Sequence, residues 1–390
     1  MTALLVMIYI SFISLGLPDG LLGASWPVMS ADFGAPLSFA GVIGMITAGG
    51  TVISSLTSDR VIKRFGTGLV TTVSVLMTAL ALLGISLSGN VFWICLLAVP
   101  LGLGAGSVDT ALNNFVALHY KAHHMNWLHC FWGVGASAGP IIMSLYIAKQ
   151  NGWKIGYGTI GIAQVALVAA LFVTLPLWKK AKSGSEESHA QGSASMLGAL
   201  KIPGVKSAML IFLVYCSLEV TMGLWGSSYL VGVRGLSAET AAQWVSLYYI
   251  GITAGRFVSG FASMKLNNTA MIRLGVIVIA AGLLAVLLPL GNTVVQIGFG
   301  MIGLGCAPIF PSMVHETPAR FGKADSQKLV GLQMASAYTG TTLTPLIVGV
   351  ASQYIGIYLF PYFLLLMFIA LVALTENLNR IVLTKSKKVS

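Results

Sequence analysis

The sequence predicts an all-α integral membrane protein with twelve transmembrane helices in two pseudo-symmetric six-helix bundles. Three observations predict it: a charge-poor composition, twelve apolar stretches of membrane-span length, and motifs that recur half a chain apart. Of the 390 residues, 56% are hydrophobic and 8% are charged, whereas a soluble protein carries about 25% charged residues. So few charges cannot cover the surface of a soluble fold of this size, which disfavours a soluble enzyme, a nucleic-acid-binding module and a disordered chain.

The span count comes from length and hydrophobicity. A span needs about 20 mostly apolar residues, and polar breaks divide this chain into twelve such stretches. The expected spans are residues 3–29, 37–58, 67–88, 91–118, 125–148, 155–178, 207–232, 237–262, 269–290, 293–317, 327–350 and 354–376. The first stretch is too long for the apolar core of a cleaved signal peptide and has no cleavage site, so it is interpreted as a retained first span.

The distribution of positive charge orients the spans. The net charge is +11, and cytoplasmic loops are enriched in Lys and Arg. With the N-terminus inside, eighteen of the 22 cations fall in inner loops or the tail and three in outer loops. We therefore expect both termini in the cytoplasm of a cell that carries the protein in its plasma or inner membrane.

The longest hydrophilic stretch divides the spans six and six. Its Gly, Ser, Ala and Lys content is typical of a flexible linker. The expected organisation is an N-terminal bundle at 1–178, a cytoplasmic linker at 179–206, a C-terminal bundle at 207–378 and a cytoplasmic tail at 379–390.

The two halves share ordered motifs. Residues 14–26 (SLGLPDGLLGASW) and 217–229 (SLEVTMGLWGSSY) match at six of thirteen positions. ITAG recurs at offset 206, GLG at offset 201, and a Gly–Pro pair five residues apart at offset 205. An offset of six spans preserves the membrane orientation, so the repeats are parallel, related by an axis along the membrane normal.

Three acids lie deep in expected spans: Asp19, Asp109 and Glu219. A charged side chain at the centre of a bilayer costs about 2.5–3.5 kcal/mol on insertion scales, so these acids are candidates for function. Asp109 and, secondarily, Asp19 would carry a proton or bind Na⁺. The alternatives are a structural partner for a buried base or for helix backbone and, for Glu219, acceptance of ligand hydroxyls.

Polar and aromatic residues near these acids are typical of a sugar site. A sugar ring presents an apolar C–H face to an aromatic plate and its hydroxyls to polar groups. Candidate substrate contacts are Asn113, His129, Trp132, Glu219, Trp225 and, more weakly, Gln333. Other aromatics, chiefly Trp26, Tyr229 and Trp244, are expected in the interfacial belt. The four cysteines (Cys95, Cys130, Cys216 and Cys306) lie far apart in apolar runs and are interpreted as buried hydrophobes, with no metal site.

Five motifs resemble the fucose permease-like branch of the major facilitator superfamily across essentially the whole chain. They are PDGLLGA (18–24), GSVDTALNNFV (106–116), NWLHCFWGVGA (126–136), YCSLEVTMGLW (215–225) and GLGCAPIFP (303–311). The resemblance implies the facilitator fold and sugar uptake coupled to a cation, usually H⁺. It places the family's span-one and span-four acids at Asp19 and Asp109, and the family Asn at Asn113. His129 and Trp132 stand where fucose permease has Gln and Asn, so fucose is not favoured.

The loop between spans two and three resembles a further facilitator signature, with Ser55 in place of its Gly. The resemblance implies a conformational latch in which Asp59, with Arg60 and Arg64, pairs in one state and releases in the other. Arg256, within a small-residue packing motif of span eight, is the expected counterpart. A plain positively charged inner loop is the alternative.

The hypothesis is a symporter for a monosaccharide, coupled to a cation (H⁺, with Na⁺ as the alternative), working by alternating access as a monomer in the lipid bilayer. A proton-coupled exporter of drugs or metabolites is the other transporter interpretation. An enzyme is disfavoured, since residues 106–109 lack the Gly-x-Gly-Asp of intramembrane aspartyl proteases. Beyond the coupling ion no cofactor is expected, and no nucleic-acid partner.

Overall fold

The computed structural model describes residues 2–120, 122–181 and 200–389, and it assigns helices and no strands to these residues. The helices of the first half are α1 (Thr2–Gly16), α2 (Leu21–Phe33), α3 (Phe39–Phe65), α4 (Thr67–Leu87), α5 (Val91–His119), α6 (Ala122–Ile147) and α7 (Gly152–Ala181). Those of the second half are α9 (Val205–Gly232), α10 (Ala238–Ala262), α11 (Asn268–Leu287), α12 (Asn292–Cys306), α13 (Ile309–Phe321), α14 (Lys323–Tyr354) and α15 (Phe360–Val389), with a short 3₁₀ turn η2 (Ile357–Leu359).

Helical stretches of the described residues occupy the positions of the twelve expected spans. Ten stretches of the described residues are long and apolar enough to cross a membrane, among them Ala3–Phe33, which joins α1 to α2, and Asn292–Phe321, which joins α12 to α13. The other two long helices, α10 and α14, occupy the positions of the expected spans eight and eleven.

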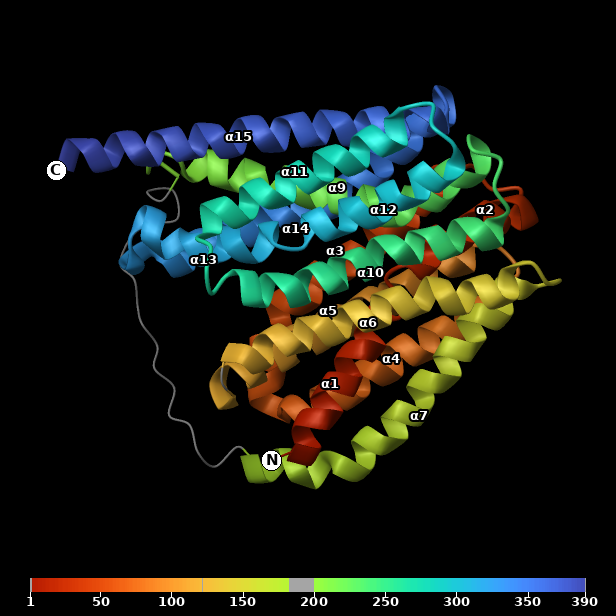
Figure 1. Cartoon of the computed structure of the whole chain (residues 1–390). Helices are drawn as coiled ribbons and strands as arrows, with labels where there is room; N and C mark the ends of the chain where they lie inside the picture. Colours follow the sequence, from red (N-terminus) through yellow and green to blue (C-terminus); the bar gives the residue numbers. More distant parts are fainter. Residues whose placement is uncertain (1, 121, 182–199, 390) are drawn as a thin grey trace.

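The helices pack as two bundles. Within the first half, α3 packs on α5, α5 on α4 and α4 on α7, and α1 packs on α6; within the second, α9 packs on α14 and α15, and α12 on α10 and α11. Figure 1 shows the first half (red to yellow-green) below the second (green to blue). The fold class predicted from the sequence is confirmed.

Two spans are broken where the sequence predicts single helices. The breaks contain Pro18, between α1 and α2, and Pro308, between α12 and α13. Proline has no backbone N–H, and its ring clashes with the carbonyl of the preceding turn. At the other end of the chain α15 continues to Val389, through the segment expected to be a tail. The expected linker lies mostly in residues 182–199, outside the described residues.

The halves meet along three helix pairs: α2 with α9, α3 with α14, and α6 with α10. Each pair has a glycine at its closest approach. A methyl group on Gly23 would overlap the Gly223 carbonyl, one on Gly41 would lie 2.5 Å from the Pro345 carbonyl oxygen, and one on Gly133 would overlap Thr253. Small residues allow close backbone contact between membrane helices, where lipid supplies no hydrophobic drive for association.

The repeated glycines make equivalent contacts in the two halves. Gly102 lies against the Thr47 carbonyl, packing α5 on α3, and its counterpart Gly303 lies against the Tyr248 carbonyl, packing α12 on α10. Gly135 and its counterpart Gly340 likewise lie against carbonyls of α1 and α9. These sequence matches therefore correspond to the same helix contacts, made once in each bundle.

The glycine contacts predict a position-specific loss of stability. Gly303→Ala would force α12 away from α10, and overpacking of this kind costs about 1–3 kcal/mol. Thermal unfolding of the purified protein in detergent should show a clearly lowered melting temperature. The matched control is Gly300→Ala, one turn earlier on α12, where the nearest atom would be 3.9 Å away. Equal melting temperatures for the two variants would contradict the packing.

Candidate functional site

The break in span one presents Asp19 on a turn between two half-helices. The Asp19 N–H bonds to the Gly16 carbonyl at 3.1 Å, and the Leu21 N–H bonds to the Pro18 carbonyl at 3.1 Å. Both hydrogen bonds join residues three apart, as in a 3₁₀ turn, and they replace the α-helical bonds between residues four apart. The carboxyl group is exposed and lines a cavity between the halves. Irregular backbone at membrane depth is tolerated where it lines such a cavity, and this is where transporter folds place their sites.

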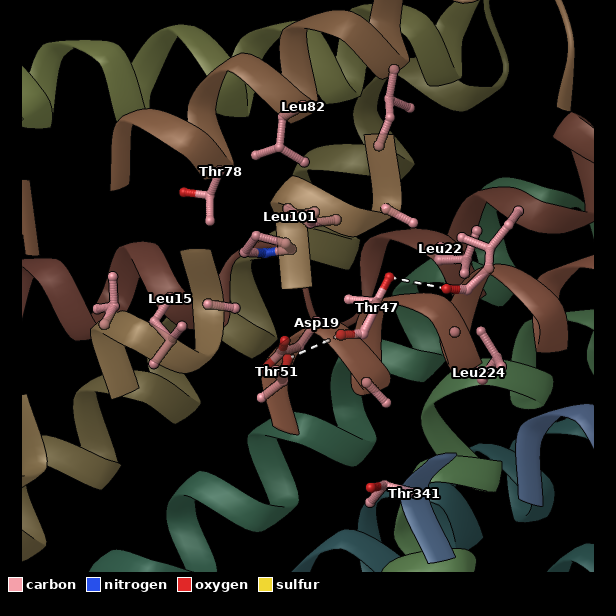
Figure 2. Close-up of a pocket in the computed structure, with 18 of the residues that line it drawn as sticks. Leu15, Asp19, Leu22, Thr47, Thr51, Thr78, Leu82, Leu101, Leu224 and Thr341 are labelled. Carbon is pink, nitrogen blue, oxygen red and sulfur yellow. Dashed lines mark hydrogen bonds between the residues drawn. The ribbon is translucent and has the colours of Figure 1, made fainter. Parts of the chain in front are cut away.

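The cavity has a volume of about 280 Å³ and is lined from both halves. Helices of the first bundle form most of its wall, and Leu224, Tyr249 and Thr341 contribute from the second. Figure 2 shows Asp19 beside Thr47 and Thr51. Thr78, of the first half, and Thr341, of the second, lie on opposite sides of the picture. Small-molecule pockets span roughly 300–1,000 Å³, so this cavity suits a compact ligand.

The hydroxyl groups around Asp19 are mainly hydrogen-bond acceptors. Thr47 Oγ1 donates to the Ile43 carbonyl at 3.0 Å and Thr51 Oγ1 to the Thr47 carbonyl at 3.1 Å (Figure 2). A hydroxyl group has one proton and two lone pairs, so these side chains offer lone pairs to the cavity. Together with the Asp19 carboxylate they match a ligand rich in hydrogen-bond donors.

A chain of polar contacts crosses from one half to the other beside the cavity. Trp132 Nε1, on α6, donates to Asp19 Oδ2 at 2.7 Å. The Arg256 guanidinium, on α10, stacks over the Trp132 ring at 4.8 Å from its centroid. Arg256 Nη2 in turn lies 4.0 Å from Glu219 Oε1, on α9. Hydrogen bonding, cation–π contact and ion pairing thus join Asp19 to Glu219 through the seam.

Asp109 has a neutral partner. Asn113, one turn further along α5, donates to Asp109 Oδ1 at 2.8 Å and to the Asp109 carbonyl at 3.0 Å. The side chain of Asp109 is half-buried. Its hydrogen bond therefore comes from an amide, while the carboxyl of Glu219 has a guanidinium nearby. From the sequence, Arg256 is the candidate base but lies near the cytoplasmic end of its span, so no deep cation was expected for these acids.

Other predicted residues lie apart from this chain. His129 is half-buried and packs edge-to-face on Phe12, with ring centroids 5.9 Å apart. Trp225 is fully buried with its ring against Gly349, and it does not line the cavity. Gln333 is also buried and accepts a hydrogen bond from Thr317 at 3.0 Å in the second bundle. In this conformation Trp225 and Gln333 are therefore not available to a substrate, contrary to expectation.

The interfacial belt expected at Trp26, Tyr229 and Trp244 is wrong for all three, since each is buried inside the protein. The Trp26 indole N–H bonds to the Leu37 carbonyl at 3.1 Å. Its polar group therefore has a hydrogen-bond partner within the protein and does not need one among the lipid headgroups. Of the expected latch, Arg60 and Arg64 are exposed at the end of α3, and the side chain of Asp59 lies outside the described part of the chain.

Some site residues were not predicted. Tyr249 lines the cavity from α10, and Gln164 lines it from α7. Gln164 is the one amide side chain in a mostly apolar span, which was the available signal. Within the described residues, no cluster of three or more His, Cys, Asp or Glu side chains is arranged to hold a metal ion.

The sequence is similar to a family of membrane transporters and to individual proteins. The Major Facilitator Superfamily model matches residues 8–315 and 208–388. "Bypass of stop codon protein 6" of Saccharomyces cerevisiae is 23% identical over 390 residues, which cover 90% of this chain and 77% of that protein. The glucose/mannose transporter GlcP of Bacillus subtilis is 23% identical over 356 residues, covering 87% and 86%.

Solved structures share the fold. A bacterial homologue of the human lysosomal transporter Spinster, inward-facing and unoccupied, superposes with a TM-score of 0.79 at 13% identity, covering 99% of this chain and 98% of that one. A variant of the E. coli fucose:proton symporter FucP superposes with a TM-score of 0.63 at 17% identity, covering 95% and 97%.

The ion pair predicts thermodynamic coupling between Glu219 and Arg256. Their side chains are 23% and 17% exposed, so Glu219→Gln leaves a mostly buried guanidinium without its counter-charge, and Arg256→Gln does the converse. Each single variant should be destabilised, and the double variant should recover about 1 kcal/mol of the summed loss, as contacting pairs do. Additive changes in thermal unfolding would show that the two groups do not interact.

Proposed function

The chain belongs to the Major Facilitator Superfamily, and from that premise we propose that it carries a monosaccharide across a membrane by alternating access. The observation that carries the proposal is the chain of contacts from Asp19 through Trp132 and Arg256 to Glu219, which spans the seam at the edge of a compact cavity. A substrate bound there would touch both halves, as a site around which they rock must.

A sugar fits the chemistry of this cavity. Sugar hydroxyls are donors, and Asp19, Thr47 and Thr51 present acceptors. The half-buried Trp132 lies beside the cavity through its bond to Asp19, and we propose that its ring meets the C–H face of the sugar. The similarity to a glucose/mannose transporter over most of both chains supports the same substrate class. Glu219 is assigned to ligand hydroxyls, and Asn113 and His129 are proposed to join the site when the halves move.

We propose that Asp109, and secondarily Asp19, carries the coupling proton. A carboxylate in a low-dielectric environment is expensive unless a cation or a proton neutralises it. Arg256 lies beside Glu219 and offsets its charge, whereas the hydrogen-bond partner of Asp109 is a neutral amide. Asp109 is therefore better suited than Glu219 to gain and lose a proton during transport.

The proposed direction is uptake across the plasma or inner membrane, with both termini cytoplasmic. At the end where α2 meets α3, Ser38 donates to Gln353 across the seam at 2.5 Å, and Trp225 packs against Gly349. The halves are in contact at this end, which the charge distribution assigns to the outside. The basic cluster of Arg60 and Arg64, with Asp59, would then sit at the cytoplasmic end as the proposed latch.

Sugar binding can be tested without transport. A ligand that binds the native state stabilises it by about 2.7 kcal/mol at 100 times its Kd. Glucose, mannose, galactose and fucose are added separately to the purified protein, and thermal unfolding is followed. At least one hexose should raise the melting temperature in wild type and do so less in Trp132→Phe, which keeps a ring but loses the donor to Asp19. Stabilisation by a cationic drug, with none by any sugar, would favour an exporter instead.

Proton coupling predicts a specific loss in Asp109→Asn. In proteoliposomes with an imposed pH gradient, wild type should accumulate the bound hexose, while the variant should only equilibrate it and retain counterflow. The matched control is Asp32→Asn, since Asp32 accepts a hydrogen bond from Trp153 away from the cavity. Full accumulation by Asp109→Asn would contradict the coupling role, and accumulation driven by a sodium gradient alone would replace H⁺ with Na⁺.

A further inference from the structure

We propose that Gln164 and Thr78 are positioning residues that hold the break in span one open, so that Asp19 faces the cavity. Neither residue is charged or aromatic, and neither belongs to the motifs that indicated a sugar site. The inference rests on the proposed role of Asp19, but the hydrogen bonds that carry it can be tested in a protein that transports nothing.

The break in span one lacks the backbone N–H that would bond to the Ser14 carbonyl. In a continuous helix the N–H of residue 18 would bond to the carbonyl of Ser14, but residue 18 is proline. The Ser14 carbonyl therefore loses its helical partner. Lipid offers no replacement, and an unsatisfied backbone group in the membrane interior costs several kcal/mol.

The second step is the donor that replaces it. Gln164 Nε2, on α7, donates to the Ser14 carbonyl oxygen at 2.8 Å, and Gln164 is 1% exposed. A carbonyl oxygen can only accept, so the amide must point its NH₂ toward Ser14 and its Oε1 away from it. The side chain from a third helix thus takes the place of the missing N–H.

The third step fixes the orientation of that amide. Gln164 Oε1 accepts a hydrogen bond from Thr78 Oγ1, on α4, at 2.8 Å. Thr78 is 5% exposed, and its hydroxyl also lies 2.9 Å from the Val75 carbonyl. Both oxygens are acceptors, so the one Thr78 proton is shared between them, and its contact with Gln164 Oε1 is the one that reaches another helix. Thr78, Gln164 and Ser14 therefore form a relay from α4 through α7 to the end of α1.

The opposite side of the break is held by α6. Methyl groups on Gly135 and Gly139 would overlap the Ile13 and Leu17 carbonyls, and one on Gly16 would overlap the Trp132 carbonyl. The end of α1 is thus clamped between the glycines of α6 and the amide of Gln164. The same helix α6 carries the indole that binds Asp19, so the clamp sets the distance over which that hydrogen bond forms.

A stability cycle tests the replacement of the N–H. Gln164→Leu removes the donor and should lower the melting temperature in detergent. Pro18→Ala restores an N–H to residue 18, so Gln164→Leu should cost clearly less in that background. An equal loss in both backgrounds would overturn the relay. This measurement needs no sugar, so it stands whether or not the proposed transport is found.

A transport cycle tests positioning as distinct from general stability. With the hexose identified by thermal shift, Gln164→Leu should reduce its pH-dependent uptake about tenfold, equivalent to 1.4 kcal/mol. In an Asp19→Asn background the same substitution should cause little further loss and no change in the pH profile. Additive losses with Asp19→Asn would assign Gln164 a structural role only and overturn the proposal.

Thr78 keeps the proposal falsifiable should Gln164→Leu fold poorly. Thr78→Val removes the hydroxyl at nearly constant shape and should reduce the pH-dependent uptake, and so change its pH profile, as Gln164→Leu does, whereas Thr78→Ser keeps the donor and should behave as wild type. Thr72→Val is the matched control, because Thr72 is buried on the same helix and its hydroxyl donates only within that helix, to the Gly68 carbonyl. Identical profiles for Thr78→Val and Thr72→Val would overturn the relay.

Discussion

The structure depends on one constraint: inside a bilayer, water cannot complete the hydrogen bonds of the backbone. Continuous helices meet this constraint by themselves, and most of the described chain is helical. The two broken spans need help from other helices. At the first break the Ser14 carbonyl receives the amide of Gln164, and at the second the Cys306 carbonyl receives the Tyr215 hydroxyl at 2.9 Å. Each break is thus supported by a side-chain donor that another span supplies.

The same constraint explains where charge is found. An ionised group at membrane depth needs a partner or a polar cavity. Asp19 has both, because the Pro18 turn exposes it to the cavity and Trp132 donates to it. Glu219 has Arg256. The two arrangements meet at the Trp132 ring, so the polar groups of one half are in contact with those of the other across a seam of closely packed glycines. A change in the charge of Asp19 or Glu219 therefore alters contacts in both bundles.

Much of the fold follows from the sequence, because span length and loop charge are properties of the chain itself. Twelve spans, and the repeat that relates Gly102 to Gly303, were predicted and are confirmed. The ITAG match is looser, since Gly49 has open space around it while Gly255 touches α12. The breaks at Pro18 and Pro308 could not be told from tolerated prolines such as Pro100, which lies within the helix α5.

The site was less accessible to sequence reasoning, because hydrophobicity gives the depth of a residue but not the face it presents. Trp225 and Gln333 have the right chemistry at a suitable depth, yet they pack inside the second bundle or the seam. Arg256 is near the end of its span by count, and only the packing of α10 on α6 brings it over Trp132. Gln164 acquires a role only once the α1 carbonyl beside it is seen to lack a partner.

The proposed function joins sugar binding between the halves to a proton carried by Asp109. The most direct measurement is proton exchange on sugar binding, followed with purified protein in weakly buffered detergent solution. A hexose that stabilises the protein should be bound with uptake of up to one proton per sugar, and Asp109→Asn should bind it without proton uptake. Binding with no proton exchange in wild type, or with equal exchange in Asp109→Asn, would contradict the account.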